Sequence, residues 1–185
     1  MISVNDFRTG ITIEIEGVLW QVIDFQHVKP GKGAAFVRCR LKNLERGSTL
    51  ERTFRGGEKV QRAIVERKPY QFLYKTDDDY VFMDNSSFEQ ITLPASTIGD
   101  GLKWLKDSMD VQIQFHGDKV LDVEMPNFVE LKVVQTDPGL KGDTAQGGSK
   151  PATVETGAVV SVPLFVEEGD VLQIDTRSGE YLKRV

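Results

Sequence analysis

The sequence predicts an all-β protein built from three small β-barrels in tandem. Short apolar segments alternate with polar residues along all 185 residues, and Gly, Pro, Asn or Asp separate many of them. Convincing helical periodicity is confined to residues 94–107. Many short strands with frequent turns are typical of small barrels, and so little helix excludes a doubly wound nucleotide-binding fold.

The first barrel is expected over residues 1–65, with a basic outer surface. Its strands are predicted at 11–16, 18–25, 36–41, 48–54 and 59–65, which suits an SH3-like barrel. Apolar residues alternate with cations in the third of these strands, so Cys39 is predicted in the core. The outward cations are Arg38, Arg40, Lys42, Arg52 and Arg55. They can bind phosphates or simply remain solvated.

A hairpin tip at 27–35 presents a single lysine between two glycines. Pro30 fixes its own φ, and Gly31 and Gly33 permit positive φ on either side of Lys32. Lys32 is therefore expected to be exposed, with no wall beside it. A solvated turn is the ordinary interpretation of such a segment. An isolated, exposed lysine also suits contact with a polyanion, or covalent modification by another enzyme.

Two further barrels are predicted beyond a charged junction at 66–69. The second, at 66–127, is expected to be a five-stranded oligonucleotide-binding (OB) barrel with strands at 70–75, 80–83, 87–93, 111–115 and 119–124. The third, at 128–185, resembles it, with strands near 128–134, 153–154, 158–162, 171–175 and 180–184. A polar loop at 141–150 is long enough to predict a functional or disordered segment.

Charge is distributed unevenly along the chain. Residues 1–64 hold 11 Lys and Arg against 7 Asp and Glu, whereas the remainder holds 12 against 21. This asymmetry indicates a polyanionic partner for the first domain, or ordinary variation of surface charge. A single cysteine favours a reducing compartment. The chain shows neither a signal peptide nor a membrane-spanning segment, so a cytoplasmic protein without membrane contact is expected.

The familiar enzyme constellations are absent from the sequence. His27 and His116 lie far apart, and no Cys/His cluster could bind zinc. An exposed Lys32 lacks the burial that a Schiff-base lysine needs. A binding protein without metal or cofactor is therefore expected, rather than an enzyme. Two other classes stay open: an enzyme that uses Lys32, and a general single-strand nucleic-acid binder, which the acidic middle domain does not favour.

Three motifs together resemble bacterial elongation factor P. They are Pro30-Gly31-Lys32-Gly33 at the hairpin tip, Gly142-Asp143-Thr144 in the polar loop, and Gly169-Asp170-Val171-Leu172 followed by Tyr181-Leu182-Lys183-Arg184 at the C-terminus. The resemblance covers the whole chain, and the third barrel distinguishes it from the two-domain, hypusine-bearing relatives. It implies an SH3-like, KOW-like first domain, two OB-fold domains and a tRNA-like shape.

The resemblance also implies a function. Such a factor would bind both ribosomal subunits between the peptidyl and exit sites, as a monomer, and stimulate peptide-bond formation at consecutive prolines. A lysine-modifying enzyme would extend Lys32 covalently. The residues expected along the acceptor end of peptidyl-tRNA are Lys29, Pro30, Gly31, Lys32 and Gly33. Those expected near the mRNA codon in the exit site are Gly142, Asp143 and Thr144, and Tyr181 and Arg184 match ribosome-facing positions.

Overall fold

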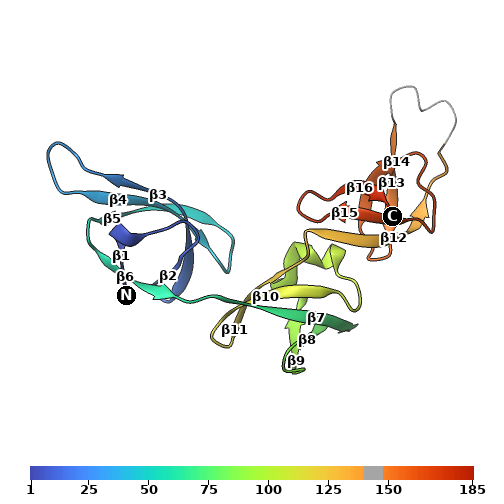
Figure 1. Ribbon diagram of the computed structural model, residues 1–185, viewed down its shortest axis with the longest axis horizontal. Coiled ribbons are helices and arrows are strands. Elements are labelled where there is room, and N and C mark those ends of the chain that lie inside the picture. Colours follow the sequence, from blue (N-terminus) through green and yellow to red (C-terminus); the bar gives the residue numbers. More distant parts are fainter. Residues whose placement is uncertain (140–147) are drawn as a thin grey trace. The chain divides into compact units, whose positions relative to one another are not determined.

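The computed structural model describes residues 1–139 and 148–185. Three sheets of antiparallel strands dominate it (Figure 1), which confirms the predicted all-β class. The chain forms two compact units, residues 1–67 with 114–122 and residues 68–113 with 123–185. Within the described residues, no helix is long and apolar enough to cross a membrane.

The first sheet contains six strands in the order β1-β6-β2-β3-β4-β5. Its elements are β1 (Ile2–Ser3), the 3₁₀ helix η1 (Val4–Asp6), β2 (Thr12–Ile15), β3 (Val18–Val28), β4 (Phe36–Asn43), β5 (Thr49–Arg55) and β6 (Lys59–Ala63). Along β4, Val37, Cys39 and Leu41 are buried and the residues between them are exposed. The predicted alternation is confirmed, because successive strand residues face opposite sides of a sheet.

The core of this barrel contains Cys39 and two phenylalanines in edge-to-face contact. The Phe7 and Phe54 ring centroids lie 5.8 Å apart at an interplanar angle of 85°, a favoured aromatic geometry. The side chain of Cys39 is 0% exposed. Burial disfavours the thiolate and raises the pKa of Cys39 to about 11. The thiol is therefore a packing group, as the sequence predicts.

Residues 114–122, which form the tip of a hairpin later in the chain, pack onto this first barrel. Leu121 lies in one apolar cluster with Leu19 and Ala63. His116 Nδ1 lies 3.1 Å from the carbonyl oxygen of Ile64, and Lys119 forms an ion pair with Glu45. These contacts explain why residues 114–122 group with the first unit.

The second sheet has the order β11-β10-β7-β8-β9. Its elements are β7 (Glu66–Thr76), β8 (Asp79–Asp84), β9 (Gln90–Pro94), α1 (Ala95–Ile98), η2 (Gly99–Trp104), β10 (Asp110–His116) and β11 (Lys119–Glu124). The predicted junction at 66–69 belongs to β7. The strand predicted at 87–93 begins only at Gln90, since a hydrogen-bonded turn occupies 84–89. The predicted helix is one α turn followed directly by a 3₁₀ helix, and the first residue of the 3₁₀ helix, Gly99, has φ +66°.

The third sheet has the order β14-β13-β12-β15-β16. Its strands are β12 (Phe128–Thr136), β13 (Ser149–Val154), β14 (Val159–Pro163), β15 (Val171–Asp175) and β16 (Glu180–Arg184). Trp104 of η2, only 3% exposed, belongs to the same buried cluster as Leu131 and Leu172. An ion pair of 3.1 Å between Lys106 and Glu155 lies beside it. The 3₁₀ helix therefore packs into the core of the third barrel, and both belong to the second unit.

Cys39 should resist alkylation in the folded protein. With a pKa raised by burial to about 11, roughly 0.1% of the thiol is thiolate at pH 8, and only the thiolate reacts. Treatment with iodoacetamide at pH 8, followed by intact-mass measurement, should give no adduct in buffer and a single adduct in guanidinium chloride. Equal labelling rates in the two conditions would mean that the thiol is not in the core.

Candidate functional site

The β3–β4 hairpin forms an arm that extends beyond the rest of its sheet (Figure 1). Its strands share eight residue pairs, from Trp20↔Asn43 to Val28↔Phe36, with one bulge between Val22 and Asp24. On the other side of β4, β5 pairs as far as Phe36↔Arg55. The pairing on both sides of β4 therefore reaches the start of the loop at 29–35, in which every residue is exposed.

Lys32 lies at the tip of this arm with open space around it. A Cβ atom added at Gly31 would meet no other atom within 4 Å, and one added at Gly33 would meet only Pro30 Cγ at 3.9 Å. Gly33 has φ +106°, whereas Gly31 is not in the positive-φ region. Of the two glycines predicted to allow positive φ, only Gly33 uses it. Among the described residues, none forms a hydrogen bond or ion pair with Lys32.

A close backbone contact supports the base of the arm. The Gly56 N–H donates to the carbonyl oxygen of Ala35 at 2.9 Å, and a Cβ at Gly56 would lie 3.0 Å from that oxygen. Next to it, the Gly57 N–H donates to Asn5 Oδ1 at 3.2 Å. Sequence reasoning treats these two glycines only as the end of a strand. Their adjacency is the one signal that could have revealed a close approach of two backbones.

Strand register separates the outward cations of β4 into two kinds. Arg40 lies opposite Asp24 on β3 and Glu51 on β5. Arg38 and Lys42 have only neutral polar partners at the corresponding positions, namely Gln26 and Thr53, and Gln21 and Thr49. Opposite charges directly across a sheet interact favourably. Arg38 and Lys42 are therefore the cations of this face that are best placed to bind phosphates.

The other predicted contact residues belong to a different barrel. Gly142, Asp143 and Thr144 lie outside the described residues. Tyr181, on β16, packs partly against the third core. Arg184, on the same strand, has Nη1 3.5 Å from Asp170 Oδ2 and its guanidinium 5.1 Å from the ring centroid of Phe165. The assignment of these residues to ribosome contacts stays a prediction.

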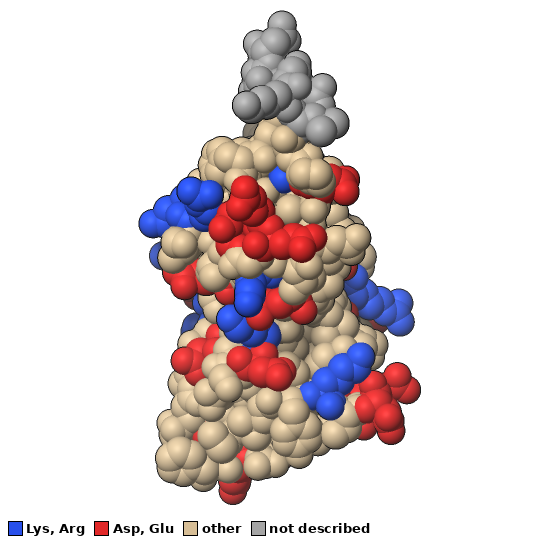
Figure 2. All heavy atoms as spheres, turned by 90° about the vertical axis from the view of Figure 1, so that its right-hand side faces the viewer, with Lys and Arg blue, Asp and Glu red and all other residues tan. Residues whose placement is uncertain are grey.

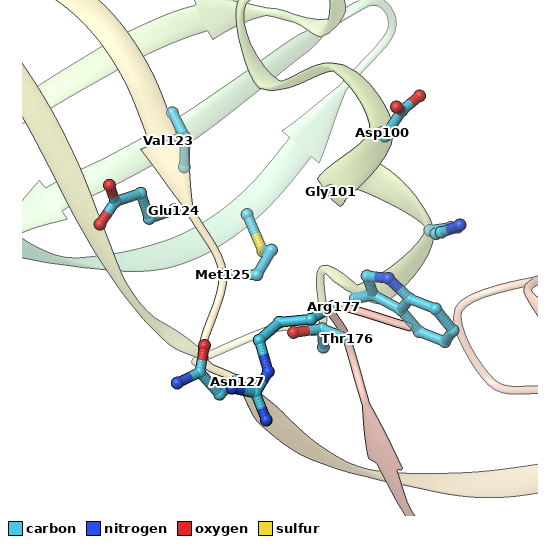
Figure 3. A pocket seen from close by; sticks show the side chains of 10 residues that line it. Asp100, Gly101, Val123, Glu124, Met125, Asn127, Thr176 and Arg177 are labelled. Atoms are coloured by element: carbon cyan, nitrogen blue, oxygen red, sulfur yellow. The ribbon is translucent and has the colours of Figure 1, made fainter. Parts of the chain in front are cut away.

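A pocket of ≈ 560 Å³ lies in the second unit (Figure 3). It is lined by Asp100, Gly101, Lys103, Trp104, Val123, Glu124, Met125, Asn127, Thr176 and Arg177. Arg177 donates to both carboxylate oxygens of Asp175, at 3.1 and 2.9 Å, and this pairing lowers the pKa of Asp175. The pocket therefore mixes opposite charges and lacks an unpaired guanidinium for an anion. In the described part of the chain, no group of three or more His, Cys, Asp or Glu could hold a metal.

Acidic and basic side chains are interspersed on the face shown in Figure 2, without one continuous basic patch. A surface for nucleic acid needs clustered cations, because phosphate contacts dominate such binding. The exposed cations of β4 and the lysine-tipped arm therefore make the first barrel the better candidate for contact with a polyanion.

Comparison with known proteins agrees with this architecture. The elongation factor P (EF-P) KOW-like domain matches residues 3–60, the EF-P OB domain matches 65–123 and the elongation factor P C-terminal domain matches 129–184. Translation initiation factor 5A from Methanococcus jannaschii is similar over 66% of this chain and 92% of its own, with a TM-score of 0.55 and 26% identity. An initiation factor 5A family protein from Naegleria fowleri shares the fold, with 67% and 96% covered, a TM-score of 0.54 and 13% identity.

Curated relatives match over their full length. Elongation factor P of Pelotomaculum thermopropionicum is 59% identical over 185 residues, and that of Desulforudis audaxviator is 58% identical over 184 residues, with 100% of both chains covered in each case. A KOW-like domain followed by an OB domain and an elongation factor P C-terminal domain places the chain among translation elongation factors. The chain belongs to the elongation factor P family, as its motifs predict.

Alanine at Gly33 should distort the arm tip, whereas alanine at Gly31 should not. At φ +106° a side chain costs about 1–3 kcal/mol, and the exposed loop can relieve this strain by moving. Amide chemical shifts measured by NMR should change throughout 29–35 for Gly33→Ala, and only beside the substitution for Gly31→Ala. The melting temperature should be unchanged in both variants. Equal shift changes in the two variants would contradict the loop geometry.

Proposed function

We propose that this protein binds the ribosome between the peptidyl and exit sites and relieves stalling at consecutive prolines. The observation that carries the proposal is the position of Lys32 at the tip of an arm whose base is held by a backbone hydrogen bond: Lys32 is exposed and has no hydrogen bond or ion pair with any residue that the structure describes. Membership of a translation factor family supports it. The protein acts as a cytoplasmic monomer, without a metal, a cofactor or enzymatic chemistry of its own.

The arm carries the contact with peptidyl-tRNA. Lys29, Pro30, Gly31, Lys32 and Gly33 are all exposed, so backbone and side chains can lie along the acceptor end. Arg38 and Lys42, on the strand that leads away from the loop, supply phosphate contacts beside it. Phosphate contacts position a protein on a nucleic acid without reading its sequence, which suits a factor that must accept many tRNAs.

Covalent extension of Lys32 gives the arm its reach. A lysine-modifying enzyme needs an amine that it can surround, and the open space on both sides of Lys32 provides one. Proline has a fixed φ and a secondary amine, so consecutive prolines hold the reacting groups in poor geometry. An extended Lys32 that stiffens the end of the peptidyl-tRNA restores the geometry of attack.

The third barrel supplies the contact with the small subunit. Gly142, Asp143 and Thr144 lie near the mRNA codon in the exit site, and Tyr181 and Arg184 contact the ribosome. Arg184 supports this assignment, because its side chain is exposed and its contacts with Asp170 and Phe165 hold the guanidinium in one orientation at the surface. The first domain then contacts tRNA on the large subunit, and the factor binds both subunits.

The Lys32→Arg variant should distinguish the contribution of the positive charge at position 32 from the contribution of covalent modification there. Arginine keeps the positive charge and binds phosphate at least as well as lysine does, but it lacks the amine that a lysine-directed enzyme extends. The variant should fold and cosediment with ribosomes. In reconstituted translation of a proline run, the rate of stall relief should fall at least tenfold, since small misplacements at a reacting centre lower the reaction rate strongly.

The matched control is Lys29→Arg, three residues away in the same loop, which should retain activity. Intact mass should show an addition on wild-type protein and on Lys29→Arg from the native host, and none on Lys32→Arg. If Lys32→Arg relieves stalling as well as the modified wild type does, charge alone is sufficient and the role of modification is refuted.

A further inference from the structure

Phe88 lies on the middle barrel in a backbone conformation that a bulky residue rarely adopts. Its φ is +63°, in the left-handed region, which is a genuine outlier for a large L-residue. Its side chain is 69% exposed. Burial of the ring therefore cannot compensate for the backbone strain within this fold.

The turn that holds Phe88 is extensively hydrogen-bonded. The Phe88 N–H donates to the carbonyl oxygen of Asp84, and the Asp84 N–H donates to that of Glu89, both at 2.9 Å. The Asp84 carboxylate accepts from the N–H groups of Ser86 at 2.7 Å and Ser87 at 3.3 Å. The Ser86 hydrogen bond is the main cause that lowers the pKa of Asp84. These bonds hold the backbone so that the ring points outward.

Phe88 differs from the other exposed phenylalanines. Phe128 is 49% exposed and Phe165 is 57% exposed. Each carries an internal guanidinium over its ring, from Arg177 at 5.3 Å and from Arg184 at 5.1 Å. In the part of the chain that the structure describes, no cation occupies the ring of Phe88. Its face is open to a cation from outside.

The charge around Phe88 also favours a cationic partner. Asp84 and Glu89 lie at the two ends of the turn. A third carboxylate, that of Asp110, lies beside it, and its Oδ1 accepts from Asn85 Nδ2 at 3.4 Å. Lys68 is the cation whose charge helps to lower the pKa of Asp84. Across residues 68–113 there are 4 Lys and Arg against 8 Asp and Glu. An RNA backbone would meet net repulsion here, whereas a basic protein surface would be attracted.

We propose that the turn at 84–89 is a docking surface for a basic protein segment, with Phe88 as its anchor. A lysine or arginine of the partner lies over the Phe88 ring, and the neighbouring carboxylates complement its charge. The inference rests on the proposed function, because it places the partner on the ribosome as one of its proteins. It assigns the middle barrel a contact with protein, distinct from the contact with tRNA at the arm.

Photo-crosslinking identifies the class of partner directly. With p-benzoylphenylalanine at position 88, irradiation in the presence of purified ribosomes should give one main adduct, with a protein of high net positive charge. An RNA adduct, or no adduct although the protein cosediments with the ribosomes, overturns the docking surface. Failure of the wild type to cosediment overturns the proposed function instead.

Matched variants then separate docking from backbone strain. Phe88→Gly should weaken ribosome binding about tenfold, a typical loss for an anchor, yet raise the melting temperature by about 2 °C through relief of strain. Ser108→Gly relieves positive φ (+66°) at another exposed position of the same barrel and should leave binding unchanged. Phe88→Trp keeps an aromatic face and should retain binding. Equal binding by Phe88→Gly and the wild type would overturn the proposal.

Discussion

The antiparallel ladder between β3 and β4 is the interaction on which the candidate site depends. Its pairing, from Trp20↔Asn43 to Val28↔Phe36, buries Cys39 and Leu41 on one face and presents Arg38 and Lys42 on the other. A slip of one residue would exchange the two faces, which would bury cations and expose the core. Because β5 supports β4 as far as Phe36, the ladder also carries the loop at 29–35 beyond the barrel.

The net charge of the rest of the chain is opposite in sign to that of the domain that carries this arm. The first 64 residues carry a net positive charge and the remainder a net negative one. A polyanion is therefore attracted to the first domain rather than to the rest of the chain. Trp104, on η2 between β9 and β10, lies in the buried cluster of the third barrel. Small barrels on their own bury little apolar surface, and this tryptophan adds to the surface that the third barrel buries.

Strands were predictable from the sequence where alternation and turn residues agree. The bounds predicted for β11, β15 and β16 are those observed, and Lys32 is exposed as expected. Features that depend on distant segments were not predictable. The carboxylates opposite Arg40 follow from a register that includes a bulge, and the contact of Gly56 with Ala35 joins separate hairpins. The left-handed backbone of Phe88 arises because the turn around Asp84 overrides the preference of a bulky residue.

The central claim is that an amine carried further from position 32 than lysine carries it, rather than a charge at the length of lysine, gives the factor its activity. Lys32→Cys tests it directly, because the buried thiol of Cys39 leaves the introduced thiol as the reactive one in folded protein. Alkylation with bromoethylamine restores the length of lysine, 6-bromohexylamine adds reach, and 1-bromohexane adds reach without an amine. Stall relief at a proline run should be greatest with the 6-bromohexylamine adduct and weak with the other two. Equal activity of all three adducts, or full activity without alkylation, would contradict the account.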